Sequence, residues 1–123
     1  MNYPADTAAL VAPHFRRREI ACPCCGLCNA DPLALLTLEW VRELVGCGFS
    51  PNSFCRCAQH NKKVGGKPRS QHLLGRAFDV PRLAGMTPQQ MAQLAESIPY
   101  VRGIGVYDWG VHFDVREGPE WRG

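Results

Sequence analysis

The sequence lacks the two kinds of hydrophobic segment that direct a protein to or through a membrane. It has no run of about eighteen apolar residues, so no transmembrane helix is expected. Its first residues, Met1–Asp6, do not place a basic stretch before a long apolar one, as a secretory signal would. We therefore expect a protein without a signal peptide that is made and kept in the cytoplasm, with no membrane as its partner.

The sequence also lacks a strong excess of charge. Its 14 basic and 11 acidic residues leave a net charge of +3, which is too small to indicate nucleic acid as a partner. The length of 123 residues fits one core, and 46% of the residues are apolar, as in ordinary globular proteins. We expect a monomer with a single domain over residues 1–123, of which residues 1–14 form a partly loose N-terminal segment.

Cysteine is plentiful, but its pattern does not fit a disulfide framework. There are seven cysteines, so complete pairing within one chain is impossible, and without an export signal disulfides are not the default. Cys25 and Cys28 have the spacing of half a zinc site, and Cys55 with Cys57 offers the other half. A second, structural zinc ion, a disulfide from the 22–28 cluster to Cys55 or Cys57, and free thiols all remain open. A cysteine-bound zinc protein for nucleic acid is disfavoured, because charged and aromatic residues are not arranged for that role.

Two short motifs contain the candidate site. The first, residues 70–79, includes His72 and Asp79, and the second, residues 109–114, includes His112. Two neutral imidazoles and one carboxylate form a common catalytic zinc set, in which water occupies the fourth position. The sequence therefore offers His72, Asp79 and His112 as metal ligands.

The spacing of His72 and Asp79 requires a bend between them. They are seven positions apart, so one uninterrupted strand would point them to opposite faces. Gly75 lies between them, where a bend costs least. Asp79 itself lies in the apolar run Ala77–Val80, and burying a lone carboxylate there is costly unless it is paired or bound to a metal. The alternative is that His72 and Asp79 cap turns independently.

The motifs resemble those of a family of zinc peptidases. Five positions match the pattern Ser-x-His-x-x-Gly-x-Ala-x-Asp of the zinc D-Ala-D-Ala carboxypeptidase and L-alanyl-D-glutamate endopeptidase (peptidase M15-like) family, and a sixth matches its last ligand: Ser70, His72, Gly75, Ala77, Asp79 and His112. Further matches extend the similarity from about Phe15 to about Arg116; they are Ser53–Arg56, His60–Asn61 and Val64–Gly66. The chain is most similar to the small phage-associated branch. The resemblance implies an α+β fold, with helices packed on a small antiparallel sheet as in the hedgehog signalling domain.

The resemblance also implies a function. The family hydrolyses an amide bond in the peptide of bacterial peptidoglycan with a zinc-activated water, as a carboxypeptidase or an endolysin-type endopeptidase. One catalytic Zn²⁺ would be held by His72, Asp79 and His112. Arg56 would bind the substrate carboxylate or stabilise the oxyanion, because its rigid fork of donors suits both roles. Ser70 is a candidate for substrate binding, or it caps a turn. A protein of this kind acts after release to the cell wall, as phage lysins do.

The general base is the weak point of the pattern. Much of the family has an acidic residue three positions before the last histidine, and this chain has Trp109 there. Asp108 is the preferred catalytic carboxylate, and Asp114 is the second candidate, as base or as the partner of a zinc ligand. If neither serves, the alternative function is a non-catalytic zinc-containing module for cell-wall binding or phage structure.

Other segments carry structural signals only. A helix is expected from the N-cap Asp31 to Gly46, a second over residues 87–98, and a hairpin of residues 101–106 with 110–115. The apolar stripe of the first helix comprises Leu33, Leu35, Leu36, Trp40, Val41 and Leu44. Its tryptophan, Trp40, is expected in the core.

Overall fold

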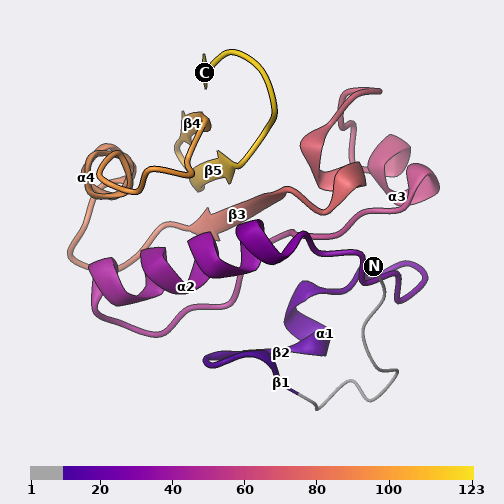
Figure 1. Ribbon diagram of the computed structural model, residues 1–123, viewed down its shortest axis with the longest axis horizontal. Helices are drawn as coiled ribbons and strands as arrows, with labels where there is room; N and C mark the ends of the chain where they lie inside the picture. Colours follow the sequence, from indigo (N-terminus) through magenta and orange to yellow (C-terminus); the bar gives the residue numbers. More distant parts are fainter. Residues whose placement is uncertain (1–9) are drawn as a thin grey trace.

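The computed structural model describes residues 10–123, which form helices and strands around a four-stranded sheet (Figure 1). In chain order the elements are β1 (Leu10–Ala12), β2 (Phe15–Arg16), α1 (Arg17–Ile20), α2 (Pro32–Val45), α3 (Ala58–Lys63), the 3₁₀ helix η1 (Gln71–Leu74), β3 (Ala77–Pro81), α4 (Pro88–Ala95), β4 (Gly103–Tyr107), β5 (Gly110–Asp114) and β6 (Trp121–Arg122). Of the N-terminal segment 1–14, the part from residue 10 contains β1, and residues 1–9 lie outside the described residues. Over the described part of the chain, every helix is too short or too polar to cross a membrane.

The four-stranded sheet has the order β3-β5-β4-β6. β5 pairs antiparallel with β3 on one side and with β4 on the other, which confirms the predicted hairpin and the predicted α+β fold with a small antiparallel sheet. β6 adds a short parallel pairing with β4 that the sequence did not predict. The register of β3 on β5 places Asp79 opposite His112, so the sheet itself brings the two motifs together.

The core lies between the helices and the sheet. α2 contacts β3, and α4 contacts β4 and β5, an arrangement that Figure 1 shows as α2 running alongside β3 and α4 beside the hairpin. Val111 and Phe113 of β5 are fully buried, as strand alternation predicts. Phe78 of β3 packs on Phe113 with 5.7 Å between the ring centroids. The second predicted helix is confirmed as α4, which begins with a capping box of Thr87 and Gln90.

α2 forms where it is predicted, but it buries a different face. Asp31 caps its N-terminus by accepting the Leu33 N–H at 2.8 Å, and Gly46 ends it with a φ of 72°. The buried residues are Ala34, Leu35, Thr37, Leu38 and Val41, whereas four of the predicted stripe are exposed: Leu33, Leu36, Trp40 and Leu44. The prediction of Trp40 in the core was wrong because apolar residues occur on nearly every side of this helix, so periodicity alone did not select one face. Trp40 instead meets Tyr100 edge-on, with 6.1 Å between the ring centroids.

Candidate metal centre

A tight turn brings His72 and Asp79 to the same side of the chain. His72 lies in η1, and the Ser70 Oγ caps this helix by accepting the His72 N–H at 3.2 Å. Gly75 ends η1 with a φ of +67°, in the left-handed region that favours glycine. A Cβ at this position would also collide with the carbonyl oxygen of Asn29. The predicted bend at Gly75 is therefore confirmed, and β3 leaves it carrying Asp79.

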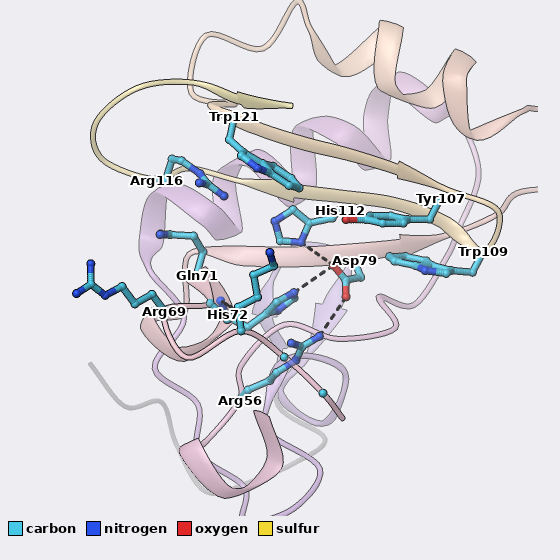
Figure 2. Close-up of a pocket in the computed structure, with 14 residues that line it drawn as sticks. Arg56, Arg69, Gln71, His72, Asp79, Tyr107, Trp109, His112, Arg116 and Trp121 are labelled. Carbon is cyan, nitrogen blue, oxygen red and sulfur yellow. Dashed lines mark hydrogen bonds and ion pairs between the residues drawn. The ribbon is translucent and has the colours of Figure 1, made fainter. Parts of the chain in front are cut away.

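The pairing of β3 with β5 adds His112 to this pair. Asp79 and His112 are opposite each other in the register, so their side chains project from the same face of the sheet. The side chains of His72, Asp79 and His112 point toward one another from η1, β3 and β5 (Figure 2). The Asp79 Oδ1 lies 3.1 Å from the His72 Nε2 and 3.0 Å from the His112 Nδ1.

The geometry of these three atoms fits a metal ion. All three lie within 4.8 Å of one another. A tetrahedral zinc ion with bonds of about 2.0–2.1 Å to nitrogen and oxygen holds its ligand atoms about 3.3 Å apart. The observed separations of 3.0 and 3.1 Å are close to that value. The set thus has the composition and the spacing of a site with three protein ligands and one open position.

The outward nitrogens of both rings are held by acceptors. The His72 Nδ1–H donates to the Phe54 carbonyl at 2.8 Å, and the His112 Nε2–H donates to the Asp114 Oδ2 at 2.9 Å. Carbonyl and carboxylate oxygens only accept, so the outward nitrogens carry the protons. The inward nitrogens face the Asp79 Oδ1 within hydrogen-bond distance, and each offers a lone pair to a metal once it carries no proton. Such outer partners fix the tautomer and orientation of zinc-binding histidines.

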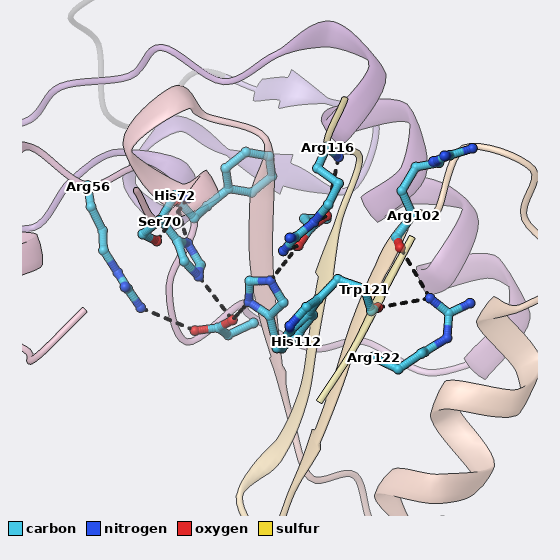
Figure 3. A network of polar contacts seen from close by, with 11 residues as sticks. Arg56, Ser70, His72, Arg102, His112, Arg116, Trp121 and Arg122 are labelled. Atoms are coloured by element: carbon cyan, nitrogen blue, oxygen red, sulfur yellow. Dashed lines mark hydrogen bonds and ion pairs between the residues drawn. The ribbon is translucent and has the colours of Figure 1, made fainter. Parts of the chain in front are cut away.

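A second ion pair holds Asp114 behind His112. The Arg116 guanidinium donates to both Asp114 oxygens, at 2.8 Å from Nε and 2.6 Å from Nη2, and Figure 3 shows this network extending from Arg56 to Arg116. Burial alone would raise the pKa of Asp114, but hydrogen bonds from Arg116 and His112 hold it well below its usual range. The outer partner of His112 is therefore a carboxylate anion.

Asp79 and His112 shift each other's pKa toward their charged forms. Burial alone would raise the pKa of Asp79, but hydrogen bonds from His112 and His72 hold it well below its usual range. Burial lowers the pKa of His112, and hydrogen bonds with Asp114 and Asp79 outweigh this effect and raise it. A metal ion at this centre would bind Asp79 in its ionised form, and it would have to displace a proton from His112.

Arg56 reaches the same carboxylate from a segment beside β3. Asp79 donates its N–H to the Ser53 carbonyl at 2.9 Å, which extends the pairing beyond the free edge of β3. The Arg56 Nη2 lies 3.4 Å from the Asp79 Oδ2. The Arg56 Nε donates to the Ser53 Oγ at 2.9 Å, and its Nη1 donates to the Asn61 Oδ1 at 3.2 Å. The guanidinium is therefore fixed in place next to the three candidate ligands, and its catalytic role stays a prediction.

These residues line a cavity of about 350 Å³. Ser70, predicted to bind substrate, lines it as well as capping η1. Asp79 is the single acidic residue among the described residues that line the cavity. The other walls are rich in basic and aromatic side chains: Arg56, Lys67, Arg69, Arg116, Tyr107, Trp109 and Trp121. The cavity therefore suits an extended ligand that carries negative charge.

Trp121 and Arg116 were missed as site residues from the sequence. β6 brings the Trp121 ring edge-on to His112, with 5.7 Å between the centroids, and the Arg116 guanidinium lies 5.1 Å from the centre of the Trp121 ring (Figure 2). A tryptophan in a polar tail was the only signal in the sequence. The position of Trp121 depends on the parallel pairing of β6 with β4, which no local sequence pattern predicts.

The two carboxylates predicted as general bases lie outside the cavity lining. Asp108 is exposed at the β4–β5 turn, where its neighbours Tyr107 and Trp109 line the cavity and stack with 5.1 Å between their centroids. Asp114 is fully buried and engaged with His112. The position of Asp114 favours the second of its predicted roles, as partner of a metal ligand. For Asp108 the role of base stays a prediction.

The fold and the site together define a class of protein. A small α+β fold in which two histidines and one aspartate converge on an open cavity has the form of a catalytic centre for one metal ion. The family model for peptidase M15 matches residues 13–114, and the chain belongs to this family, as its resemblance predicted. Family membership supports a zinc-dependent metallopeptidase. No match is found among curated proteins.

We expect Asp114→Asn to weaken zinc binding at this centre by about 10–100-fold, because loss of an outer partner typically has an effect of this size. An amide lacks the negative charge that pairs with Arg116 and supports His112. Competition with a chromophoric chelator measures the affinity. Asp108→Asn is the matched control, since Asp108 does not line the cavity, and an equal loss in both variants would contradict the role given to Asp114.

Proposed function

We propose that the protein is a zinc-dependent peptidase that hydrolyses an amide bond in the peptide of bacterial peptidoglycan. One observation carries the proposal: the His72 Nε2, Asp79 Oδ1 and His112 Nδ1 converge at an open cavity while both outward ring nitrogens are held by acceptors. A chance cluster of ion pairs would not need an oxygen acceptor on the outward nitrogen of each ring. A zinc ion bound there would supply a Lewis acid and lower the pKa of water toward neutrality.

Arg56 is proposed to bind the oxygen that becomes negative during the reaction, or a carboxylate of the substrate. Its named contacts use three of the five N–H groups of a guanidinium, so donors remain for a ligand in the cavity. Its contact with the Asp79 Oδ2 places these donors beside the candidate ligands. The Arg56 side chain is only 14% exposed, so water screens its charge weakly.

The walls of the cavity support an acidic peptide as substrate. Lys67, Arg69 and Arg116 line it together with Arg56, and they favour a ligand with free carboxylates, such as the peptides of bacterial cell wall. The stacked rings of Tyr107 and Trp109 form one apolar wall. The three candidate ligands and Arg56 converge within a single chain, and we propose a monomer as the active form. Action on this substrate requires release of the protein to the cell wall.

A second candidate function is a non-catalytic zinc module that binds the cell wall or serves in a phage structure. It is favoured by one observation: Asp79 is the lone acidic residue among the cavity-lining residues of the described chain. A peptidase of this type needs a group that takes a proton from water and passes it to the leaving amine. For Asp108 to serve, the β4–β5 turn has to move when substrate binds.

The experiment that separates the two functions is hydrolysis of purified peptidoglycan by the zinc-loaded protein. We expect newly freed amino groups, no release after chelation, and recovery of release when zinc is returned. Mass spectrometry of the products names the bond: a single terminal amino acid indicates a carboxypeptidase, and larger fragments indicate an endopeptidase. Zinc binding at the centre without amine release would refute the peptidase and support the non-catalytic module.

A further inference from the structure

Four cysteine thiols gather at a second place in the molecule, apart from the cavity. The sulfur atoms of Cys22, Cys25 and Cys57 all lie within 4.8 Å of one another. The thiol of Cys24 hydrogen-bonds to that of Cys57 as well. The cluster joins two segments that are 35 positions apart in sequence, since Cys57 donates its N–H to the Cys22 Sγ at 3.4 Å.

The grouping differs from the one that spacing predicted. The sequence pairs Cys25 with Cys28 and Cys55 with Cys57 as two half-sites. In the structure Cys28 and Cys55 are fully buried and hydrogen-bond to each other in the core. Of the options that the sequence left open, the structure does not favour the half-site of Cys25 with Cys28, because Cys22 lies with Cys25 instead.

A short turn aims the first cysteines at one point. The Gly26 N–H donates to the Cys22 carbonyl and the Cys22 N–H to the Leu27 carbonyl, both at 2.8 Å. Gly26 has a φ of +80°, which closes the turn at low cost for glycine. Two residues separate Cys22 from Cys25 in the sequence, as in a zinc half-site, and the turn places both near Cys57. Cys22 is buried, whereas Cys24 and Cys25 are exposed, so an ion can reach the cluster from solvent.

Backbone amides stabilise negative charge on this sulfur cluster. The His60 N–H donates to the Cys57 Sγ at 3.4 Å, and the Cys57 N–H donates to the Cys22 Sγ. Metals bind thiolates rather than thiols, and amide donors of this kind stabilise the thiolate form of Cys22 and Cys57.

We propose that Cys22, Cys25 and Cys57, with Cys24 as the fourth ligand, bind a structural zinc ion. Zinc with bonds of about 2.3 Å to sulfur places its ligand atoms about 3.8 Å apart, and the sulfur atoms of Cys22, Cys25 and Cys57 lie within 4.8 Å of one another. Cys24 joins these three through its contact with Cys57. Four thiolates favour zinc over the hard cations Mg²⁺ and Ca²⁺. A disulfide would use only two of the four sulfur atoms.

The site fastens the segment that carries Arg56. Arg56 lies between Cys55 and Cys57, and its N–H donates to the His72 carbonyl at 3.3 Å. An ion bound at Cys57 would therefore connect the turn of residues 22–27 to the segment that positions Arg56 in the cavity wall. This role concerns positioning, and the metal site itself does not depend on the proposed peptidase activity.

Cobalt titration of the fully reduced, metal-free protein tests the proposal. Tetrahedral thiolate-bound Co²⁺ gives an intense near-ultraviolet charge-transfer band that a site of histidine and aspartate does not give. We expect this band to saturate at one equivalent in His72→Ala/His112→Ala, where the cavity centre is removed. The band should be absent from Cys22→Ser/Cys25→Ser and unchanged in Cys47→Ser, an exposed cysteine outside the cluster.

Two outcomes would overturn the assignment. One is a reduced, folded protein that takes up Co²⁺ without the thiolate band. The other is an undiminished band in Cys22→Ser/Cys25→Ser. Because the double variant can fail to fold, Cys24→Ser gives a second measurement at an exposed position: a weaker, shifted band supports Cys24 as fourth ligand, and an unchanged band refutes that part. The band is read without any substrate, so failure of peptidase activity leaves this test intact.

Discussion

Replacing His72 with alanine is expected to remove one zinc ion per chain and to lower kcat/KM on a cell-wall peptide by about 10³-fold or more. A metal Lewis acid supplies several kcal/mol of charge stabilisation, and each 1.4 kcal/mol or so is a tenfold change in rate. His72 is only 2% exposed, and its Nε2 is one of three atoms that converge on the centre. Elemental analysis gives the zinc content, and the count of freed amino groups gives the rate.

His72→Asn separates loss of the ligand from loss of the fold. Asparagine can donate its amide N–H to the Phe54 carbonyl, which accepts from the His72 Nδ1 at 2.8 Å. Alanine leaves that carbonyl without this partner, at a cost of about 1–3 kcal/mol. Both variants should lose the ion, with His72→Asn keeping more of the thermal stability. Full zinc content in either folded variant would refute His72 as a ligand.

Replacing Arg56 with alanine is expected to lower kcat by about 10²–10³-fold, the usual effect of losing one donor to a developing oxyanion. The loss should appear at saturating zinc, because the three candidate ligands remain. Arg56→Lys should recover little of it, since an ammonium cannot reproduce the three directed contacts to Ser53, Asn61 and Asp79. Steady-state kinetics on a soluble cell-wall peptide, with the zinc content of each sample measured, provide the comparison.

Arg42→Ala is the matched control for Arg56→Ala. Arg42 lies in the last turn of α2 and does not line the cavity, so its removal takes away the same charge without touching the site. We expect wild-type kcat and KM from this control. If Arg56→Ala raises KM but leaves kcat unchanged, Arg56 binds the substrate carboxylate and has no role in stabilising the oxyanion.

The sequence by itself determined the local geometry of the site. The bend at Gly75, the cap at Ser70 and the alternation along β5 all follow from neighbouring residues, because a positive φ, an N-cap and a strand period are local properties. The motifs offered His72, Asp79 and His112 as ligands of one metal ion, and the family resemblance favoured this option over independent turn caps. The same local rules gave the start and end of α2.

Only the tertiary structure decided which more distant residues join them. The buried face of α2, the placement of Trp121 over His112 and the exchange of Cys28 for Cys22 in the sulfur cluster all depend on contacts between segments far apart in the chain. The same holds for Asp114, which the fold turns toward Arg116 and buries completely. The local sequence pattern determines the backbone conformation at a residue and the direction of its side chain. The residues that this side chain contacts depend on how helices and strands pack, and many packings satisfy the same local pattern.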